Sequence, residues 1–281
     1  MNRLLSLRDP RYYQIAALGS LATWGIVVLD FGVSVLQVLL TVAVALSTQW
    51  LGTRAVGLPR FDPLSPLITS LSLTILLRTD LPALSALAAA IAIGSKFLVR
   101  VNGKHIFNPA NVAIVTLMMF SDRAWIASGQ WGSTTFVAFA LCCLGFMVLN
   151  RAKRSETTLA FLGFHAALLL GRALWLGDPL SIPLHQLQNG TLLIFSFFMI
   201  SDPKTTPDAG AGRILFAGIV AVIAYLIQFV LYEPHGPVIA LILSSPLVPL
   251  IDRLLRGKHY QWSRPSRHSR NPIKGVYSCE S

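Results

Sequence analysis

The stretch Met199–Pro207 reads MISDPKTTP and follows directly on the apolar run Thr191–Ile200. Pro203 and Pro207 cannot lie inside a helix without removing a backbone hydrogen bond and clashing with the preceding turn. The chain must therefore leave helical geometry at this point. A second polar interruption that contains a proline, NGKHIFNPAN, lies at Asn102–Asn111. Irregular backbone at membrane depth is tolerated only where protein or a water-filled cavity covers it. Two such interruptions in one apolar chain predict a binding site.

The composition is typical of an integral membrane protein, because 54% of the 281 residues are hydrophobic and only 12% are charged. We expect an all-α polytopic membrane protein with about ten transmembrane segments. The predicted segments are about 12–29, 31–51, 66–78, 82–99, 109–120, 131–149, 157–176, 190–201, 212–232 and 237–252.

The basic residues predict the orientation of these segments. The formal net charge is +11, but with a cytoplasmic N-terminus only Arg78, Arg123 and Arg172 of the 23 Lys and Arg residues lie on the outer side. The positive-inside rule predicts this asymmetry. We therefore expect a multi-pass protein of the inner (plasma) membrane with both termini in the cytoplasm and no nucleic-acid partner.

The segment lengths predict internal symmetry. The third, fifth and eighth segments have only some 11–13 residues, roughly 16–20 Å of helix, against a hydrocarbon core of about 30 Å. The tenth is interrupted by Pro246. Short, broken segments at matching positions of two halves indicate inverted repeats with a site near their interface. We expect one membrane domain, residues 1–255, made of inverted five-segment repeats at about 12–120 and 131–252. Residues 256–281 form a basic tail, expected to be disordered and attracted to anionic membrane lipid.

The first interruption carries groups that can hold a ligand. Ser201 and Asp202 can cap or end helices, while Lys204, Thr205 and Thr206 offer a cation and two hydroxyl donors. This set suits a phosphate group or the polar edge of a ring. A plain cytoplasmic turn with helix caps is the equally weighted alternative.

The second interruption offers complementary groups. Pro109 suits the first turn of a helix with Asn108 as its N-cap, and Asn111 presents a donor and an acceptor one turn inside. Lys104 stands at the cytoplasmic face, where contact with lipid is the simpler role. A flavin needs donors for its ring carbonyls and N5 together with an apolar slot. Phe107 is a candidate for part of that slot, although a lone aromatic is more typical of a core. We expect these residues of both interruptions to bind a cofactor, and no catalytic residue.

Other reactive side chains give weaker signals. Cys142 and Cys143 are adjacent, so no zinc or redox spacing exists and no metal site is predicted. Packing is their simplest role, with an intramembrane iron centre shared with a partner chain as the alternative. His165 and Arg172 share a helix face, and a charged residue in a membrane segment is a functional candidate.

The two interruptions also resemble a known family. SKFLVRVNGKHIFNPAN (Ser95–Asn111) and FFMISDPKTTP (Phe197–Pro207) are similar to the signature stretches of the NqrB protein of the Na⁺-translocating NADH:quinone reductase and of the RnfD protein of the Rnf complex. The chain is also similar to stand-alone relatives found beside enediyne biosynthesis genes. The resemblance implies a ten-helix inverted-repeat fold that binds flavin and passes electrons across the membrane, in the large complexes alongside ion translocation. Other redox subunits and quinone are the implied partners.

One departure from the family bears on the cofactor. Members of the large complexes carry an SGAT-type sequence before the eighth segment, whose Thr holds FMN through a phosphoester. Here the connection Gly177–Thr191 reads GDPLSIPLHQLQNGT, and no Thr precedes Thr191 in it. The resemblance therefore implies a non-covalent flavin, riboflavin or FMN, and covalent FMN is not expected.

These observations predict an electron-transfer subunit that binds flavin non-covalently and acts with redox partners. The chain has no soluble domain for NADH and no iron–sulfur cysteines, so it is not expected to complete a respiratory reaction alone. A transporter of small solutes or ions on the same fold is the alternative. A structural or assembly subunit of a membrane complex is a further alternative.

Overall fold

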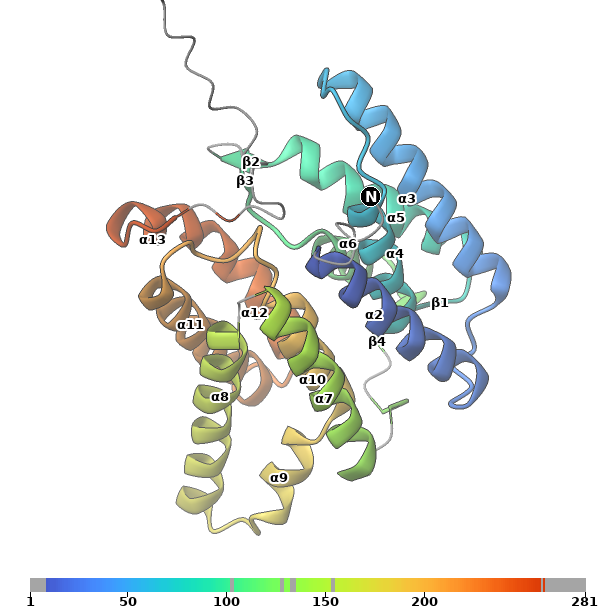
Figure 1. Ribbon diagram of the computed structural model, residues 1–281. Helices are drawn as coiled ribbons and strands as arrows, with labels where there is room; N and C mark the ends of the chain where they lie inside the picture. Colours follow the sequence, from blue (N-terminus) through green and yellow to red (C-terminus); the bar gives the residue numbers. More distant parts are fainter. Residues whose placement is uncertain are drawn as a thin grey trace, which may run out of the picture.

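A computed structural model describes residues 9–101, 104–126, 129–131, 135–152, 155–258 and 260. The fold is mostly helical (Figure 1), and the predicted hydrophobic segments coincide with helices. The helices of the N-terminal half are α2 (Pro10–Val27), α3 (Val35–Ala55), α4 (Leu64–Leu76), α5 (Pro82–Leu98) and α6 (Pro109–Phe120). The helices of the C-terminal half are α7 (Thr135–Ala152), α8 (Ser155–Leu176), α9 (Ser181–Leu187), α10 (Gly190–Ile194), α11 (Gly210–Phe229), α12 (Gly236–Ser244) and α13 (Val248–Leu254).

Two short strand pairs depart from the all-α prediction. Strand β1 (Leu77–Thr79) pairs antiparallel with β4 (Ala124–Ile126), so that Arg78 lies opposite Trp125. Strand β2 (Arg100–Val101) pairs with β3 (Lys104–His105). Both pairs form at connections between helices, where the backbone N–H and C=O groups of an extended segment need hydrogen-bond partners.

Among the residues that the structure describes, four helices are long and apolar enough to cross a membrane by length and composition. They are Val35–Ala55, Ser155–Leu176, Gly210–Phe229 and the continuous run Gly236–Leu254. That run is α12 joined to α13 through a 3₁₀ turn at Ser245–Leu247, which contains the predicted break at Pro246. The other apolar helices are shorter, so ten membrane segments remain a prediction.

Helices at corresponding positions of the two halves make corresponding contacts. In the N-terminal half α3 packs on α5, α5 on α6 and α2 on α4, whereas in the C-terminal half α8 packs on α11, α11 on α12 and α7 on α10. The halves meet where α2 contacts α7 and α6 contacts α12. The central helices α5 and α11 both use fully buried alanines, which allow helix backbones to approach closely.

The eighth predicted segment is broken by a π-helix, Phe195–Met199, which continues α10. The Thr158 hydroxyl donates to the Ser196 carbonyl at 2.6 Å, and Ser201 Oγ donates to the Phe197 carbonyl at 2.5 Å. Gly145 of α7 packs so closely on the Phe197 ring that a Cβ atom there would overlap it. The extra residue in this turn changes the direction in which the chain leaves toward Asp202.

The end of the described chain crosses the turn that follows this π-helix. Residues 255–258 and 260, here named the C-terminal strap, follow α13. A Cβ atom at Gly257 would overlap the backbone of Asp208 and Ala209, and Lys204 Nζ donates to the Tyr260 carbonyl at 3.3 Å. Most of the predicted basic tail lies outside the described residues.

Candidate functional site

The two predicted interruptions meet in space. Asn108 is the N-cap of α6, where its Oδ1 accepts from the Asn111 amide at 3.1 Å. Its Nδ2 donates to the carbonyl of Met199, the last residue of the π-helix, at 3.3 Å. One buried amide side chain therefore joins the start of one broken segment to the end of the other.

A small recess lies beside this contact, here named the Asn108 recess. Its volume is about 50 Å³. Of the predicted cofactor residues, it brings together Asn108, Pro109, Asp202 and Lys204. The other lining residues are Arg11, Gln14, Ser65, Ile68, Thr69, Ser72, His105, Ala110 and Phe198.

Asn111 does not line the recess, although it is fully buried one turn further along α6. Its Nδ2 donates to the Val238 carbonyl of α12 at 3.0 Å. Its Oδ1 has no hydrogen-bond partner among the described residues. A buried amide oxygen without a donor is costly, so this atom marks a place where a ligand or water hydrogen would be stabilised.

Lys104 lies on β3, outside the recess. Its Nζ donates to the Thr206 carbonyl and contacts Asp208 Oδ1 at 3.3 Å and Asp252 Oδ2 at 3.2 Å. The Asp208 amide in turn donates to Asp252 Oδ1 at 2.8 Å. Lys104 therefore ties the second interruption to the loop before α11 and to α13.

The predicted hydroxyl donors are used within a tight turn. The carbonyl of Asp202 accepts from the amides of Thr205 and Thr206, each at 3.2 Å, and from the Thr206 hydroxyl at 2.9 Å. The Asp202 side chain accepts from the Lys204 amide at 3.0 Å. Ser201, Thr205 and Thr206 thus fit the alternative of a capped turn, whereas Asp202 and Lys204 reach the recess.

Cations gather around the recess. The pKa of His105 is lowered to about 3, first by burial and then by nearby cations, of which Lys96 contributes most. Burial also lowers the pKa of Lys204, an effect that Asp202 opposes. Lys96 itself is buried in α5, where its Nζ donates to Gln49 Oε1 at 2.8 Å and to Ser65 Oγ at 2.9 Å. The recess therefore favours a ligand edge that carries negative charge or carbonyl oxygens.

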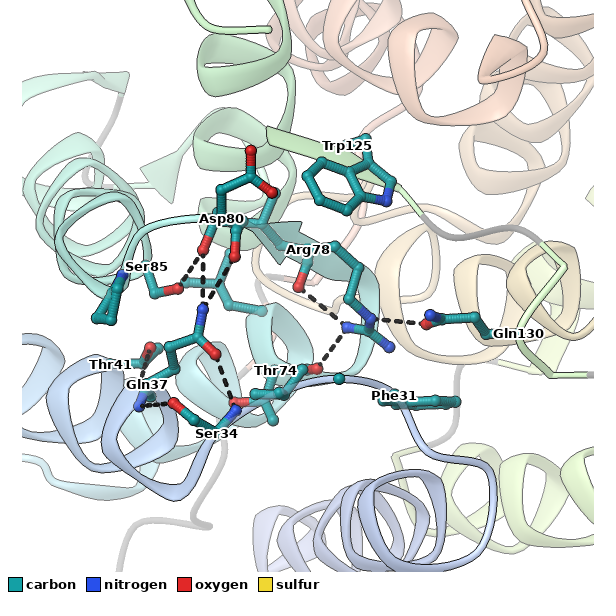
Figure 2. A pocket seen from close by; sticks show the side chains of 16 residues that line it. Phe31, Ser34, Gln37, Thr41, Thr74, Arg78, Asp80, Ser85, Trp125 and Gln130 are labelled. Carbon is teal, nitrogen blue, oxygen red and sulfur yellow. Dashed lines mark hydrogen bonds between the residues drawn. The ribbon is translucent and has the colours of Figure 1, made fainter. Parts of the chain in front are cut away.

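A second site, which the sequence did not predict, lies at the other end of α4 (Figure 2). This cavity has a volume of about 470 Å³ and is here named the Arg78 cavity. It is lined by Phe31, Gly32, Val33, Ser34, Gln37, Thr41, Leu73, Thr74, Leu77, Arg78, Thr79, Asp80, Pro82, Ser85, Trp125 and Gln130. In the sequence, Arg78 is the residue that could have indicated this cavity, because it is one of the three basic residues that do not follow the positive-inside pattern.

Arg78 closes the C-terminal end of α4. Its Nη1 donates to the carbonyls of Thr74 at 2.9 Å and Leu77 at 3.0 Å, and its Nη2 donates to the Ile75 carbonyl at 3.2 Å. Its Nε donates to Gln130 Oε1 at 2.7 Å. These carbonyls belong to the last turn of α4 and the start of β1, where buried acceptors need donors from elsewhere.

Comparison with known proteins places this architecture in a family. Residues 118–261, just over half of the chain, match the NQR2, RnfD, RnfE family. The D subunit of the ion-translocating oxidoreductase complex of Escherichia coli O7:K1 (strain IAI39 / ExPEC) is 28% identical over 139 residues, which cover 50% of this chain and 35% of that protein. Its counterpart in Escherichia coli (strain K12) is 29% identical over 142 residues, with the same coverage of 50% and 35%. The chain thus matches about a third of the length of these relatives. The resemblance predicted from the two interruptions is confirmed, and the chain belongs to the NQR2, RnfD, RnfE family.

Proposed function

We propose that this protein is a membrane subunit of an electron-transfer complex and holds a flavin, riboflavin or FMN, non-covalently at the Asn108 recess. The observation that carries the proposal is the direct contact of the two interrupted segments, Asn108 to Met199, beside a cation-rich recess. Family membership supports it, because the E. coli relatives are named as subunits of an ion-translocating oxidoreductase complex. Such a subunit acts with other redox proteins, and quinone is a candidate partner.

The chemistry of the recess suits the polar edge of a flavin. Asn108 and Lys204 supply donors for ring carbonyls. Phe198 and Ile68 supply apolar walls. A bound flavin would contribute one- and two-electron transfer, while the surrounding cations would stabilise negative charge on the reduced ring.

The size of the recess adds a condition. Sites for small molecules usually measure about 300–1,000 Å³, whereas this recess measures about 50 Å³. A whole flavin ring therefore requires the turn at Asp202–Pro207 to move outward. The C-terminal strap holds that turn through Gly257 and through the bond from Lys204 to Tyr260. Flavin binding should thus increase the exposure of the strap.

Flavin content and stability measured on the same samples test the proposal. The absorption spectrum of the purified protein gives the flavin stoichiometry, and fluorescence of a denatured gel band tests for covalent attachment, which we expect to be absent. Asn108→Ala and Asp202→Ala should reduce bound flavin about 5- to 150-fold in affinity, since each removes a polar contact worth ~1–3 kcal/mol. Asn189→Ala is the matched control, because Asn189 caps α10 away from the recess.

The capped-turn alternative predicts a different pattern. Loss of any of these caps would then lower stability by ~1 kcal/mol without changing flavin content. Colourless wild-type protein, or an Asn108→Ala variant with full flavin, would defeat the flavin proposal. A fluorescent band that survives denaturation would defeat non-covalent binding alone.

We further propose that the chain crosses the inner membrane with ten segments arranged in two inverted repeats. Both termini then lie in the cytoplasm. The matching contacts of α3 with α5 and of α8 with α11 support the repeats. A reporter fused after Ser281 should report a cytoplasmic location. A signal from the outer side would contradict this topology.

One observation favours a second function, passage of a small ion or solute. Ser65, Thr69 and Ser72 of α4 line the Asn108 recess, while Thr74, two residues after Ser72, lines the Arg78 cavity. Polar groups therefore follow α4 from one site to the other. Ser72→Leu should block flux in proteoliposomes if this is a path, and flux unchanged by Ser72→Leu would count against it.

A further inference from the structure

Arg78 carries a buried positive charge that no described carboxylate neutralises. The residue is only 4% exposed, and its guanidinium lies 4.3 Å from the centre of the Phe31 ring. Within the part of the chain that the structure describes, no carboxylate forms an ion pair with it. Its acceptors are three carbonyls and the Gln130 amide oxygen, which carry only partial negative charge. Buried charges are normally paired, so the adjoining cavity is a place for an anion.

Three helix ends meet at the cavity, of which two are N-termini, while Arg78 covers the C-terminal carbonyls of the third, α4. Both α3 and α5 begin here, since Ser34 and Gln37 of α3 and Pro82 and Ser85 of α5 line the cavity. The N-terminus of a helix carries partial positive charge. Among the described residues, no side chain caps the start of α5. Asp80 is the one carboxylate on the lining among these residues; it is exposed, and Figure 2 shows its carboxylate turned away from the guanidinium.

The cavity also provides a directed donor and a flat wall. Of the five N–H groups of Arg78, four make the bonds described above, which leaves one on Nη2. Trp125 lies directly opposite Arg78 in the β1–β4 pair. Side chains of directly opposite residues stand on the same face of a strand pair, about 4.5–5.5 Å apart at Cβ. An anionic group at Arg78 would thus place an attached ring beside the indole.

We infer that the Arg78 cavity binds a small organic anion, with its carboxylate or phosphate group at Arg78 and its ring against Trp125. The volume of about 470 Å³ is far larger than an inorganic anion needs and falls in the usual range for small-molecule sites. The anionic group can belong to a water-soluble molecule or to a lipid headgroup. This site is separate from the proposed flavin recess, which lies at the other end of α4.

Sodium benzoate is a suitable probe, because it joins a carboxylate to one flat ring. Its binding is measured by calorimetry and by thermal stabilisation of the full-length protein in neutral detergent, with benzamide as the uncharged isostere. Ser85→Asp places a negative charge on the cavity wall without touching Arg78, and Ser85→Asn is its neutral match. Trp125→Leu removes the flat wall from an exposed position.

We expect wild type and Ser85→Asn to bind benzoate and to show no binding of benzamide. Ser85→Asp should weaken benzoate binding roughly 10- to 100-fold, the usual value of a charge-assisted contact, and Trp125→Leu should weaken it less. Phosphatidylglycerol that competes with benzoate, where phosphatidylcholine does not, would support anion binding at Arg78, identify a lipid phosphate as its ligand and overturn the ring contact with Trp125. Equal binding of benzamide, or benzoate binding that Ser85→Asp leaves unchanged, would overturn the inference. Flavin content is read separately, so failure here leaves the proposed function untouched.

Discussion

Lys104 should stabilise the packing of β3 against the loop before α11 and against α13, and its removal should destabilise the protein strongly. The side chains of Lys104, Asp208 and Asp252 are only 10%, 12% and 22% exposed. At 3.2 Å and an effective dielectric constant of about 20, each pair attracts by about 5 kcal/mol before desolvation is subtracted. Breaking buried pairs costs about 3–5 kcal/mol and exposed pairs about 0–1, so this partly buried set should contribute about 2–3 kcal/mol.

Lys104→Met tests this value, because it keeps the length of the side chain but leaves two carboxylates beside one another. We expect the melting temperature in detergent to fall by roughly 5–10 °C, at about 2–4 °C per kcal/mol. The double variant Lys104→Met/Asp252→Asn should recover part of the loss, since it removes the repulsion between Asp252 and Asp208. Flavin content per folded molecule should stay constant. Unchanged stability of Lys104→Met, or no recovery in the double variant, would refute the role assigned to this triad.

Three further substitutions have defined outcomes. The pKa of His105 falls from 6.5 to about 3, so the unfolded chain binds more protons between these values and stability should fall as pH drops below 6.5. His105→Gln should remove that slope, up to about 2 kcal/mol between pH 6.5 and 5, measured by thermal melts across pH; equal slopes would contradict it. Gly257→Val should displace the C-terminal strap, because its side chain would overlap the backbone of Ala209. Trypsin should then cleave faster at Lys258 with little change in melting temperature, and an unchanged cleavage rate would argue against the contact. Thr158→Val should cost about 1–2 kcal/mol and increase hydrogen exchange in the π-helix, because it removes the donor to Ser196; exchange equal to wild type would show that the bond is dispensable.

The helices could be predicted because apolar runs bounded by polar or proline-containing connections define them locally. The break at Pro246 was visible for the same reason, since proline acts on its own preceding turn. The strand pairs β1–β4 and β2–β3 were not predicted, because runs of two or three residues have no periodicity. The π-helix at Phe195–Met199 was also missed, since its stability depends on Thr158 and Gly145 from other helices.

The candidate site could be predicted only in outline. Two proline-containing interruptions in an apolar chain indicated that Asn108 and the MISDPKTTP turn would lie close together, and the bond from Asn108 to Met199 joins them. Which side chains face the recess depends on partners far along the chain. Lys104 is turned away by Asp208 and Asp252, residues more than a hundred positions later. Spacing within a motif carries no information about such partners.

Short helices in a membrane bundle create polar sites by necessity. A helix of 13 residues such as α4 ends inside the protein, where its last carbonyls cannot reach water. Arg78 satisfies these carbonyls, and the cost of burying its charge then favours an anion in the cavity beside it. At the end of the π-helix the Ser201 hydroxyl and the Asn108 amide donate to the carbonyls instead, and both groups are neutral. The Arg78 cavity and the Asn108 recess should therefore differ in ligand, since among the described residues only the Arg78 cavity has a buried charge on its wall without an ion-pair partner.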